Sequence, residues 1–192
     1  MMRSTGFLFG VIVALVSIAV SELAEAQSSM KSVVDSKGRF AIDFPGDWHV
    51  VRPESGMVAV LGVATAKEGP NPASVNVVVE DLPQAVSSET YALASERMLR
   101  MVFHNYTAIQ AGTATIAGQT AYYRYFTWQP NTGGALYQIQ VYFTAGRRGF
   151  VITGSTWNNP ESTRRYVPII VQVIETFRPT TNAFALDGAG VR

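Results

Sequence analysis

The chain has 192 residues, a formal net charge of +1 and a hydrophobic share of 47%, and it contains no cysteine. The missing thiols exclude disulfides, thiol catalysis and thiolate metal sites. A charge so close to zero gives no indication of a nucleic-acid or polyanion partner. The length fits one domain, and a single hydrophobic core must hold the fold without covalent support.

The first 26 residues have the pattern of a signal peptide. Arg3 supplies a positive charge, Phe7 to Val20 form an apolar run of 14 residues, and Ala24-Glu25-Ala26 is a small-x-small cleavage site. A membrane-spanning helix needs about 20 apolar residues, so a retained anchor is disfavoured, and no cysteine follows that could carry a lipid. We therefore expect a chain that begins at Gln27 after cleavage, has no membrane span, and lies outside the cytoplasm, in the periplasm or secreted.

Short strands separated by turns are predicted after a flexible lead-in over residues 27–37. Phe40, Ile42 and Phe44 alternate with polar or small residues, which is the period of a half-buried strand. Pro45-Gly46-Asp47 then turns the chain. Further strands are predicted over residues 48–52, 57–65 and 74–81.

A helix is predicted from Ser87 or Ser88, either of which can cap its N-terminus, to about Val102. Apolar residues recur along it at helical spacing, namely Tyr91, Ala94, Met98, Met101 and Val102. A stripe that contains methionines is more often core than a cofactor site, so these side chains are expected to pack inside the protein.

Four more strands are predicted over residues 107–116, 119–129, 136–145 and 149–157. The last two form a hairpin if residues 146–149 are its loop, and Phe143 is then opposite Ile152. In this register one face is polar and the other holds the apolar side chains Ile139, Val141, Phe143, Phe150 and Ile152. The strand over 119–129 carries aromatic residues on both faces, which indicates that both faces are covered.

The last element is a helix that begins at Asn159-Pro160-Glu161, with a cap, a proline at the first helical position and an acid in the first turn. Pro168 lies inside its apolar stripe. Either the helix is kinked there, or an opening turn gives way to a second helix that begins at Pro168. Arg178-Pro179 ends the element, and the tail over residues 180–192 is expected to be disordered.

Several framework motifs resemble the PsbP-like domain superfamily. They are Phe40-x-Ile42-x-Phe44-Pro45-x-x-Trp48, Ser74-Val75-Asn76-Val77-x-Val79, Gly118-Gln119-x-Ala121-Tyr122-Tyr123, and Tyr166-x-Pro168 running to Thr176-Phe177-Arg178-Pro179. The resemblance covers residues 38–179. That superfamily includes the extrinsic PsbP subunit of photosystem II, the DcrB-type periplasmic proteins and a eukaryotic Ran-binding relative.

The resemblance implies an α+β fold, a single-domain α/β/α sandwich with a central, mainly antiparallel sheet and helices on both faces. It also implies a non-catalytic role, because the family's roles are mostly those of accessory or protein-binding domains. The bacterial style of the export signal favours an envelope accessory over a photosystem role. One fold hosts many functions, so these motifs speak for fold rather than function.

Metal binding is considered because some PsbP-like proteins bind divalent cations. Asp43, Asp47 and His49 lie within seven residues, and a turn could bring them together. The two aspartates are equally typical of a strand and a Pro-Gly turn, and a metal site needs three or four converging ligands.

No motif for hydrolysis is present. The chain has no G-x-S-x-G and no H-E-x-x-H, and Ser155 in Gly154-Ser155-Thr156 has no His or Asp placed beside it on the predicted strand. The sequence therefore predicts a protein that is not an enzyme and needs no cofactor.

Paired arginines are the remaining candidates for a binding surface. Arg147 and Arg148 are predicted at the tip of the hairpin, Arg164 and Arg165 at the start of the last helix, and Tyr142 on the polar face of its strand. They either keep the protein soluble or form a patch that binds an acidic partner or an anionic lipid head group. The sequence thus favours an envelope accessory with a protein partner. The alternative is a divalent-metal or small-ligand binding protein, including one with a photosystem role.

Overall fold

A computed structural model describes residues 30–54, 56–65, 72–131 and 133–184. The expected signal peptide over residues 1–26 and the last residues of the expected tail, 185–192, lie outside the described part. No helix in the described ranges is long and apolar enough to cross a membrane.

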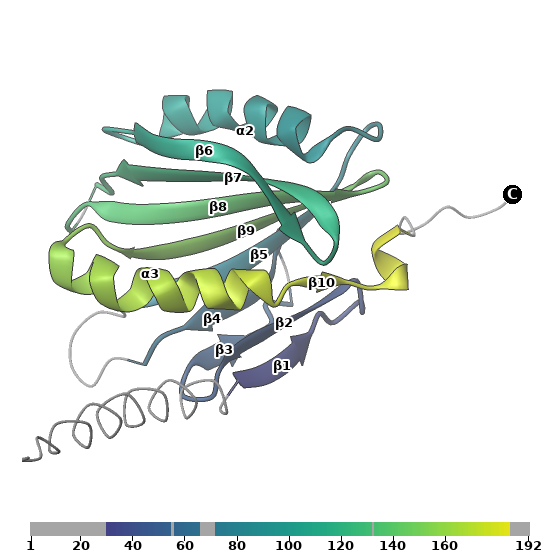
Figure 1. Cartoon of the computed structure of the whole chain (residues 1–192), viewed down its shortest axis with the longest axis horizontal. Coiled ribbons are helices and arrows are strands. Elements are labelled where there is room, and N and C mark those ends of the chain that lie inside the picture. Colours follow the sequence, from purple (N-terminus) through teal and green to yellow (C-terminus); the bar gives the residue numbers. More distant parts are fainter. Residues whose placement is uncertain (1–29, 55, 66–71, 132, 185–192) are drawn as a thin grey trace, which may run out of the picture.

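The centre of the molecule is an antiparallel sheet of seven strands in the order β3-β4-β5-β9-β8-β7-β6 (Figure 1). Its strands are β3 (His49–Val51), β4 (Val58–Val63), β5 (Ala73–Asp81), β6 (Thr107–Ile116), β7 (Gln119–Trp128), β8 (Leu136–Ala145) and β9 (Arg148–Trp157). β5 pairs with β9 although a helix and three strands separate them in the chain. This pairing joins the N-terminal and C-terminal halves into one sheet.

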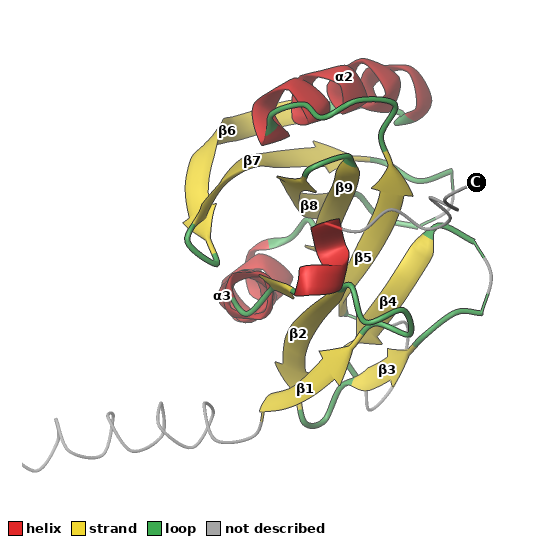
Figure 2. Ribbon diagram, turned by 90° about the vertical axis from the view of Figure 1, so that its right-hand side faces the viewer, coloured by secondary structure: helices red, strands yellow, loops and turns green. Residues whose placement is uncertain are grey.

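Two helices cover opposite faces of this sheet, α2 (Ser88–Val102) and α3 (Pro160–Glu175) (Figure 2). Two glycines of β9 show how closely the two helices approach the sheet. A Cβ added to Gly149 would lie 2.8 Å from the Tyr91 ring of α2, and one added to Gly154 would lie 2.1 Å from Ile170 Cγ2 of α3. Positions five apart in a strand point to opposite faces. The predicted sandwich with helices on both faces is confirmed.

A second, three-stranded sheet lies on the α3 side, in the order β1-β2-β10. It consists of β1 (Met30–Val34), β2 (Phe40–Pro45) and β10 (Arg178–Pro179). The alternating side chains Phe40, Ile42 and Phe44 of β2 are fully buried, as their period predicts. The sequence did not indicate that β2 leaves the main sheet, because strand order depends on distant pairings.

The core fills the space between the α3 face of the main sheet and the elements that cover it. Phe40, Phe143, Phe150 and Phe177 form a cluster with ring centroids 5.4–6.0 Å apart. Buried core residues extend from Val33 to Ala183. A chain that begins at Gln27 therefore retains every one of them.

The hairpin of β8 and β9 has the predicted faces but a different register. Its turn is Gly146-Arg147, and Phe143 is opposite Phe150, while Ile152 is opposite Val141. The predicted partner of Phe143 was Ile152. A register shift of two residues leaves every side chain on its face, so the apolar pattern alone could not distinguish the two pairings.

Both ends of the described part, residues 30–34 and 181–184, contain more structure than their composition predicts. Residues 30–34 of the expected flexible lead-in form β1, which pairs along its whole length with β2. In the expected disordered tail, Thr181–Phe184 form the 3₁₀ turn η1. Pro168 lies inside the single helix α3, on its exposed side, so the chain does not start a second helix there.

The stripe predicted as core on the first helix points mostly to solvent. Tyr91 is buried, but Met98, Met101 and Val102 are 60%, 78% and 60% exposed. The buried side of α2 consists of small and polar residues, including Ser88 and Ala92. The sheet under α2 carries the polar side chains Arg124 and Gln140, and Arg124 donates to the Ala92 carbonyl of the helix, so the methionine stripe is not the side that faces the sheet.

Candidate functional site

Part of the sheet face on the α2 side is left uncovered by the helix. α2 packs on β7 and β8, at one side of the sheet. Val63, Ser74, Ser155 and Gln138 lie directly opposite one another on β4, β5, β9 and β8. They share the face of Val151, which contacts the core under α2. The row therefore extends across the α2 side of the sheet, from β8, on which the helix packs, to β4, on which it does not pack.

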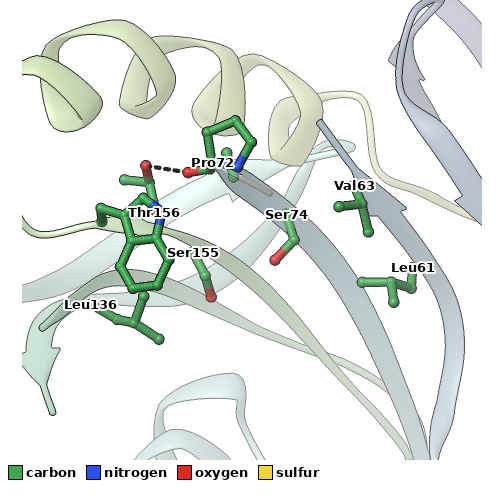
Figure 3. Close-up of a pocket in the computed structure, with 9 residues that line it drawn as sticks. Leu61, Val63, Pro72, Ser74, Leu136, Ser155 and Thr156 are labelled. Carbon is green, nitrogen blue, oxygen red and sulfur yellow. Dashed lines mark hydrogen bonds between the residues drawn. The ribbon is translucent and has the colours of Figure 1, made fainter. Parts of the chain in front are cut away.

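A pocket of about 340 Å³ lies on this face, at one end of the sheet. Val63 ends β4, Ala73 begins β5, Leu136 begins β8 and Trp157 ends β9. Figure 3 shows the hydroxyls of Ser74 and Ser155 between Leu61 and Val63 on one side and Leu136 on the other. Below, this cavity is called the sheet-end pocket, and its lining is Leu61, Val63, Pro72, Ala73, Ser74, Leu136, Ser155, Thr156 and Trp157.

The chemistry of the sheet-end pocket is uncharged. None of its nine lining residues carries an ionisable side chain. The Gln138 amide donates to Ser155 Oγ at 2.7 Å, which leaves the serine proton to be donated to a bound group. Thr156 Oγ1 donates to the Pro72 carbonyl at 2.8 Å and fixes the rim (Figure 3). Such a lining can bind apolar or hydroxyl-bearing groups, and it offers no general base or nucleophile pair for catalysis.

Tyr142 does not reach the surface, because α2 covers it. Its hydroxyl donates to Gln140 Oε1 at 2.6 Å, and its ring lies under the guanidinium of Arg124. Arg124 is 2% exposed and donates to the Ala92 carbonyl of α2 at 3.0 Å and to Glu96 at 3.2 Å. Burial raises the pKa of Tyr142 to about 12. These contacts attach α2 to the sheet, so the expected role of Tyr142 in docking is corrected to a structural one.

Arg148 is also buried, and its expected place in a docking patch is corrected. It is 1% exposed, donates to Asp81 Oδ1 at 3.2 Å, and donates to the Asn182 carbonyl of η1 at 2.8 Å. Arg147 is exposed in the turn and donates to the Leu82 carbonyl at 3.2 Å. The two arginines thus attach neighbouring segments to the hairpin.

Arg164 and Arg165 are exposed in the first turns of α3. The helix begins three residues after Trp157, so both arginines lie at the same end of the sheet as the sheet-end pocket. The turn that contains Arg147 lies at the other end of β9, about 30 Å away for a strand of this length. The structure therefore does not bring the two arginine pairs together.

Asp43, Asp47 and His49 do not converge. The Arg178 guanidinium donates to both carboxylate oxygens of Asp43, at 2.6 and 3.1 Å, and this hydrogen bonding holds the pKa of Asp43 below its ordinary value. Asp47 is exposed, and His49 is exposed at the start of β3. Among the described residues, no group of three His, Asp or Glu side chains is placed to hold a metal ion. The structure therefore does not bring the three predicted ligands together, and Asp43 forms an ion pair with Arg178.

The pocket residues were missed because their neighbours are distant in the sequence. Ser74 and Ser155 are adjacent only through the pairing of β5 with β9. Trp157 is the one local signal of the pocket. It is a large aromatic residue at the end of β9, on the strand face that also carries the polar side chains of Thr153 and Ser155.

Comparison with models of protein families and with curated proteins finds no match. Among solved structures, the chain is similar to PsbP of the cyanobacterium Synechocystis sp. PCC 6803 (CyanoP), with 13% identity and a TM-score of 0.58 over 79% of this chain and 93% of that one. It is similar to the Ran-binding protein Mog1p of Saccharomyces cerevisiae, with 14% identity and a TM-score of 0.58 over 82% and 99%.

A third similar structure is LpqN of Mycobacterium tuberculosis, described as involved in cell envelope biogenesis, with 16% identity and a TM-score of 0.56 over 82% and 96%. The chain has the PsbP-like fold. At these identities the likeness of the PsbP-like fold establishes architecture alone, and function must be argued from the site.

Proposed function

We propose that this protein is an exported, non-catalytic accessory of the cell envelope that binds a partner protein through the sheet-end pocket. The observation that carries the proposal is the uncharged pocket on the part of the sheet face that α2 leaves uncovered. Apolar side chains and serine hydroxyls together suit a partner that inserts an apolar side chain and bonds its polar groups at the rim.

The exposed charges at this end of the sheet favour an acidic partner. Arg164 and Arg165 are exposed at the same end of the molecule, and no acid among the described residues forms a salt bridge with them. Both arginines lie on α3, on the opposite face of the sheet from the pocket. Positive surface residues near a binding site accelerate association with an acidic partner and help to fix its orientation. In this proposal the pocket makes the apolar contact, and the two arginines favour partners with an acidic surface.

Two further observations support the proposal. Mog1p is named for binding Ran and LpqN for envelope biogenesis, so proteins of this fold include a binding protein and an envelope protein. The charge, apolar run and cleavage motif of residues 1–26 support export.

Site-specific photo-crosslinking in cells tests the proposal. A photoreactive residue at Ser74 is expected to capture a discrete envelope partner, whereas one at Glu89 on α2 is not. Trp157→Ala should lower the crosslink yield at least about tenfold by removing an aromatic anchor, and Phe184→Ala, at a side chain 55% exposed elsewhere, should leave it unchanged. Equal capture from both positions, or an unchanged yield in Trp157→Ala with an unchanged melting temperature, contradicts the proposal.

A small uncharged ligand is the second candidate, because the pocket volume lies within the range of ligand sites. Native mass spectrometry of the exported protein distinguishes the two. A co-purifying small molecule that is absent from Ser74→Phe would favour the ligand, and an unmodified mass favours the protein partner.

A further inference from the structure

One edge of the seven-stranded sheet is long and unpaired. β6 pairs with β7 on its inner side, and its outer side pairs with no other described strand. Of its ten residues, all but Gly112 and Ile116 are exposed. Figure 2 shows β6 at the border of the sheet, and α2 packs on the neighbouring strands β7 and β8. Its outward backbone N–H and C=O groups are therefore open to another strand.

Apart from one irregularity near its start, this edge lacks the features by which proteins usually prevent strand addition. Natural edge strands are short, carry lysine or proline, are bulged, or are covered by another element. The opposite edge, β3, is three residues long. β6 contains no charged residue and no proline, and its one irregularity, between Ala108 and Gln110, leaves a regular ladder from Gln110 to Ile116.

We propose that β6 pairs antiparallel with β6 of a second copy of this chain, which joins the two sheets across a two-fold axis at Thr113. Residues opposite one another in an antiparallel pair lie on the same face, and residues of one strand on the same face are an even number apart. In a symmetric pair, one residue must therefore lie opposite its own copy. Thr113 is the middle of the regular ladder, so an axis there pairs the most residues.

The composition of β6 fits a second copy in particular. In a symmetric pair, each charged side chain near the axis would lie beside the same charge of its copy, which is unfavourable. β6 has none. With the axis at Thr113, the threonine hydroxyls meet each other, Gly112 lies opposite Ala114, and Ala111 lies opposite Thr115. Small side chains on both faces let the two backbones approach without steric conflict.

Single cysteines test the position of the axis, since the chain has no cysteine of its own. In the chain that begins at Gln27, Thr113→Cys should form a disulfide-linked dimer under mild oxidation. Ala94→Cys, exposed on α2, should remain monomeric and serves as the control. Crosslinking of both at the same rate would reflect random collision and would overturn the proposal.

Sedimentation equilibrium tests association without a crosslink. An interface made by one strand is small, so the dimer should be weak and should accumulate over concentrations from about 5 to about 500 µM. Thr113→Lys should be monomeric throughout with an unchanged melting temperature, and Ala94→Lys should dimerise as the wild type does. A monomeric wild type over the whole range, or a Thr113→Lys variant that still dimerises, overturns the proposal.

Discussion

Phe143 lies at the centre of the aromatic cluster between β8, β9 and the segment after α3. It is fully buried, and its ring centroid lies 6.0 Å from that of Phe150 and 5.6 Å from that of Phe177. Phe143→Ala removes these contacts and leaves a cavity that the surrounding sheet cannot close, so it should lower the free energy of unfolding by about 3–5 kcal/mol. Urea unfolding followed by circular dichroism measures the loss. A loss under about 1 kcal/mol would mean that this core is not packed as described.

Gln140 shows how burial under α2 increases the loss of stability when a polar side chain is removed. Its side chain accepts from Tyr142 and donates to Thr153 Oγ1 at 3.3 Å under α2. Gln140→Ala leaves the buried Tyr142 hydroxyl without its acceptor, so the expected loss is about 1–3 kcal/mol. On an open strand face, as the sequence suggests, it would be under about 1 kcal/mol. Urea unfolding in the Tyr142→Phe background is the control, because there the same substitution should cost less.

The Asp43–Arg178 ion pair predicts a pH dependence. Hydrogen bonds from Arg178 lower the pKa of Asp43 in the folded chain, and partial burial opposes them. A carboxyl whose pKa is lower in the folded state stabilises the fold above its unfolded pKa of about 3.9 and loses this contribution as the pH falls. Near neutral pH, the wild type should therefore have a higher melting temperature than Asp43→Asn. This difference in melting temperature should shrink below about pH 4. A difference that stays constant to pH 2 contradicts the ion pair as its source.

At the scale of elements, α3 can lie close to the sheet because β9 has no side chain at Gly154. A Cβ there would come within 2.1 Å of Ile170 Cγ2, a branched side chain in the buried face of α3. Gly154→Ala should therefore displace the helix and cost about 1–3 kcal/mol. Gly134→Ala, whose Cβ would meet Trp157 at an ordinary 3.7 Å, is the control and should change thermal stability little. Equal melting temperatures would show that α3 adjusts freely.

Element prediction succeeded where local pattern carries the information. A serine cap at the start of α2, the proline at the start of α3 and the two faces of the β8–β9 hairpin follow from spacing and turn chemistry, and the structure selects Ser87 from the two candidate caps. The orientation of α2 did not follow, because Met98 and Met101 form the apolar stripe while the helix faces a polar sheet surface with Arg124 and Gln140. Which face of an amphipathic helix is inward depends on the surface that it meets.

For the whole molecule, the position of the N-terminus is testable by deletion. The exported protein should begin at Gln27, as mass spectrometry of the intact protein can show, and it should melt like the full chain because the buried core begins at Val33. A chain that begins at Lys37 loses β1, which pairs with β2 over five residues, and should melt lower. Equal melting temperatures of the two shortened chains would show that β1 adds no stability, which is the behaviour expected of a flexible lead-in.

The candidate site illustrates why function was the harder inference. The arginine pairs and Tyr142 are conspicuous in the sequence, but burial removes Arg148 and Tyr142 from the surface, and the length of β9 separates Arg147 from Arg164 and Arg165. The sheet-end pocket instead depends on side chains of no obvious chemistry. They form a candidate site only because they lie on neighbouring strands.

The sequence by itself determined both helices, most of the strands, the two faces of the β8–β9 hairpin and the absence of thiol chemistry, because these depend on composition and on patterns within about fifteen residues. The class of fold was implied by the resemblance of the framework motifs to the PsbP-like superfamily. Only the tertiary structure decided the order of the strands, the separate small sheet, the inward face of α2 and the sheet-end pocket. Each of these depends on which distant segments become neighbours, such as β5 beside β9. The free energy of such a pairing comes from side chains on both strands together, so no local pattern on either one can specify it.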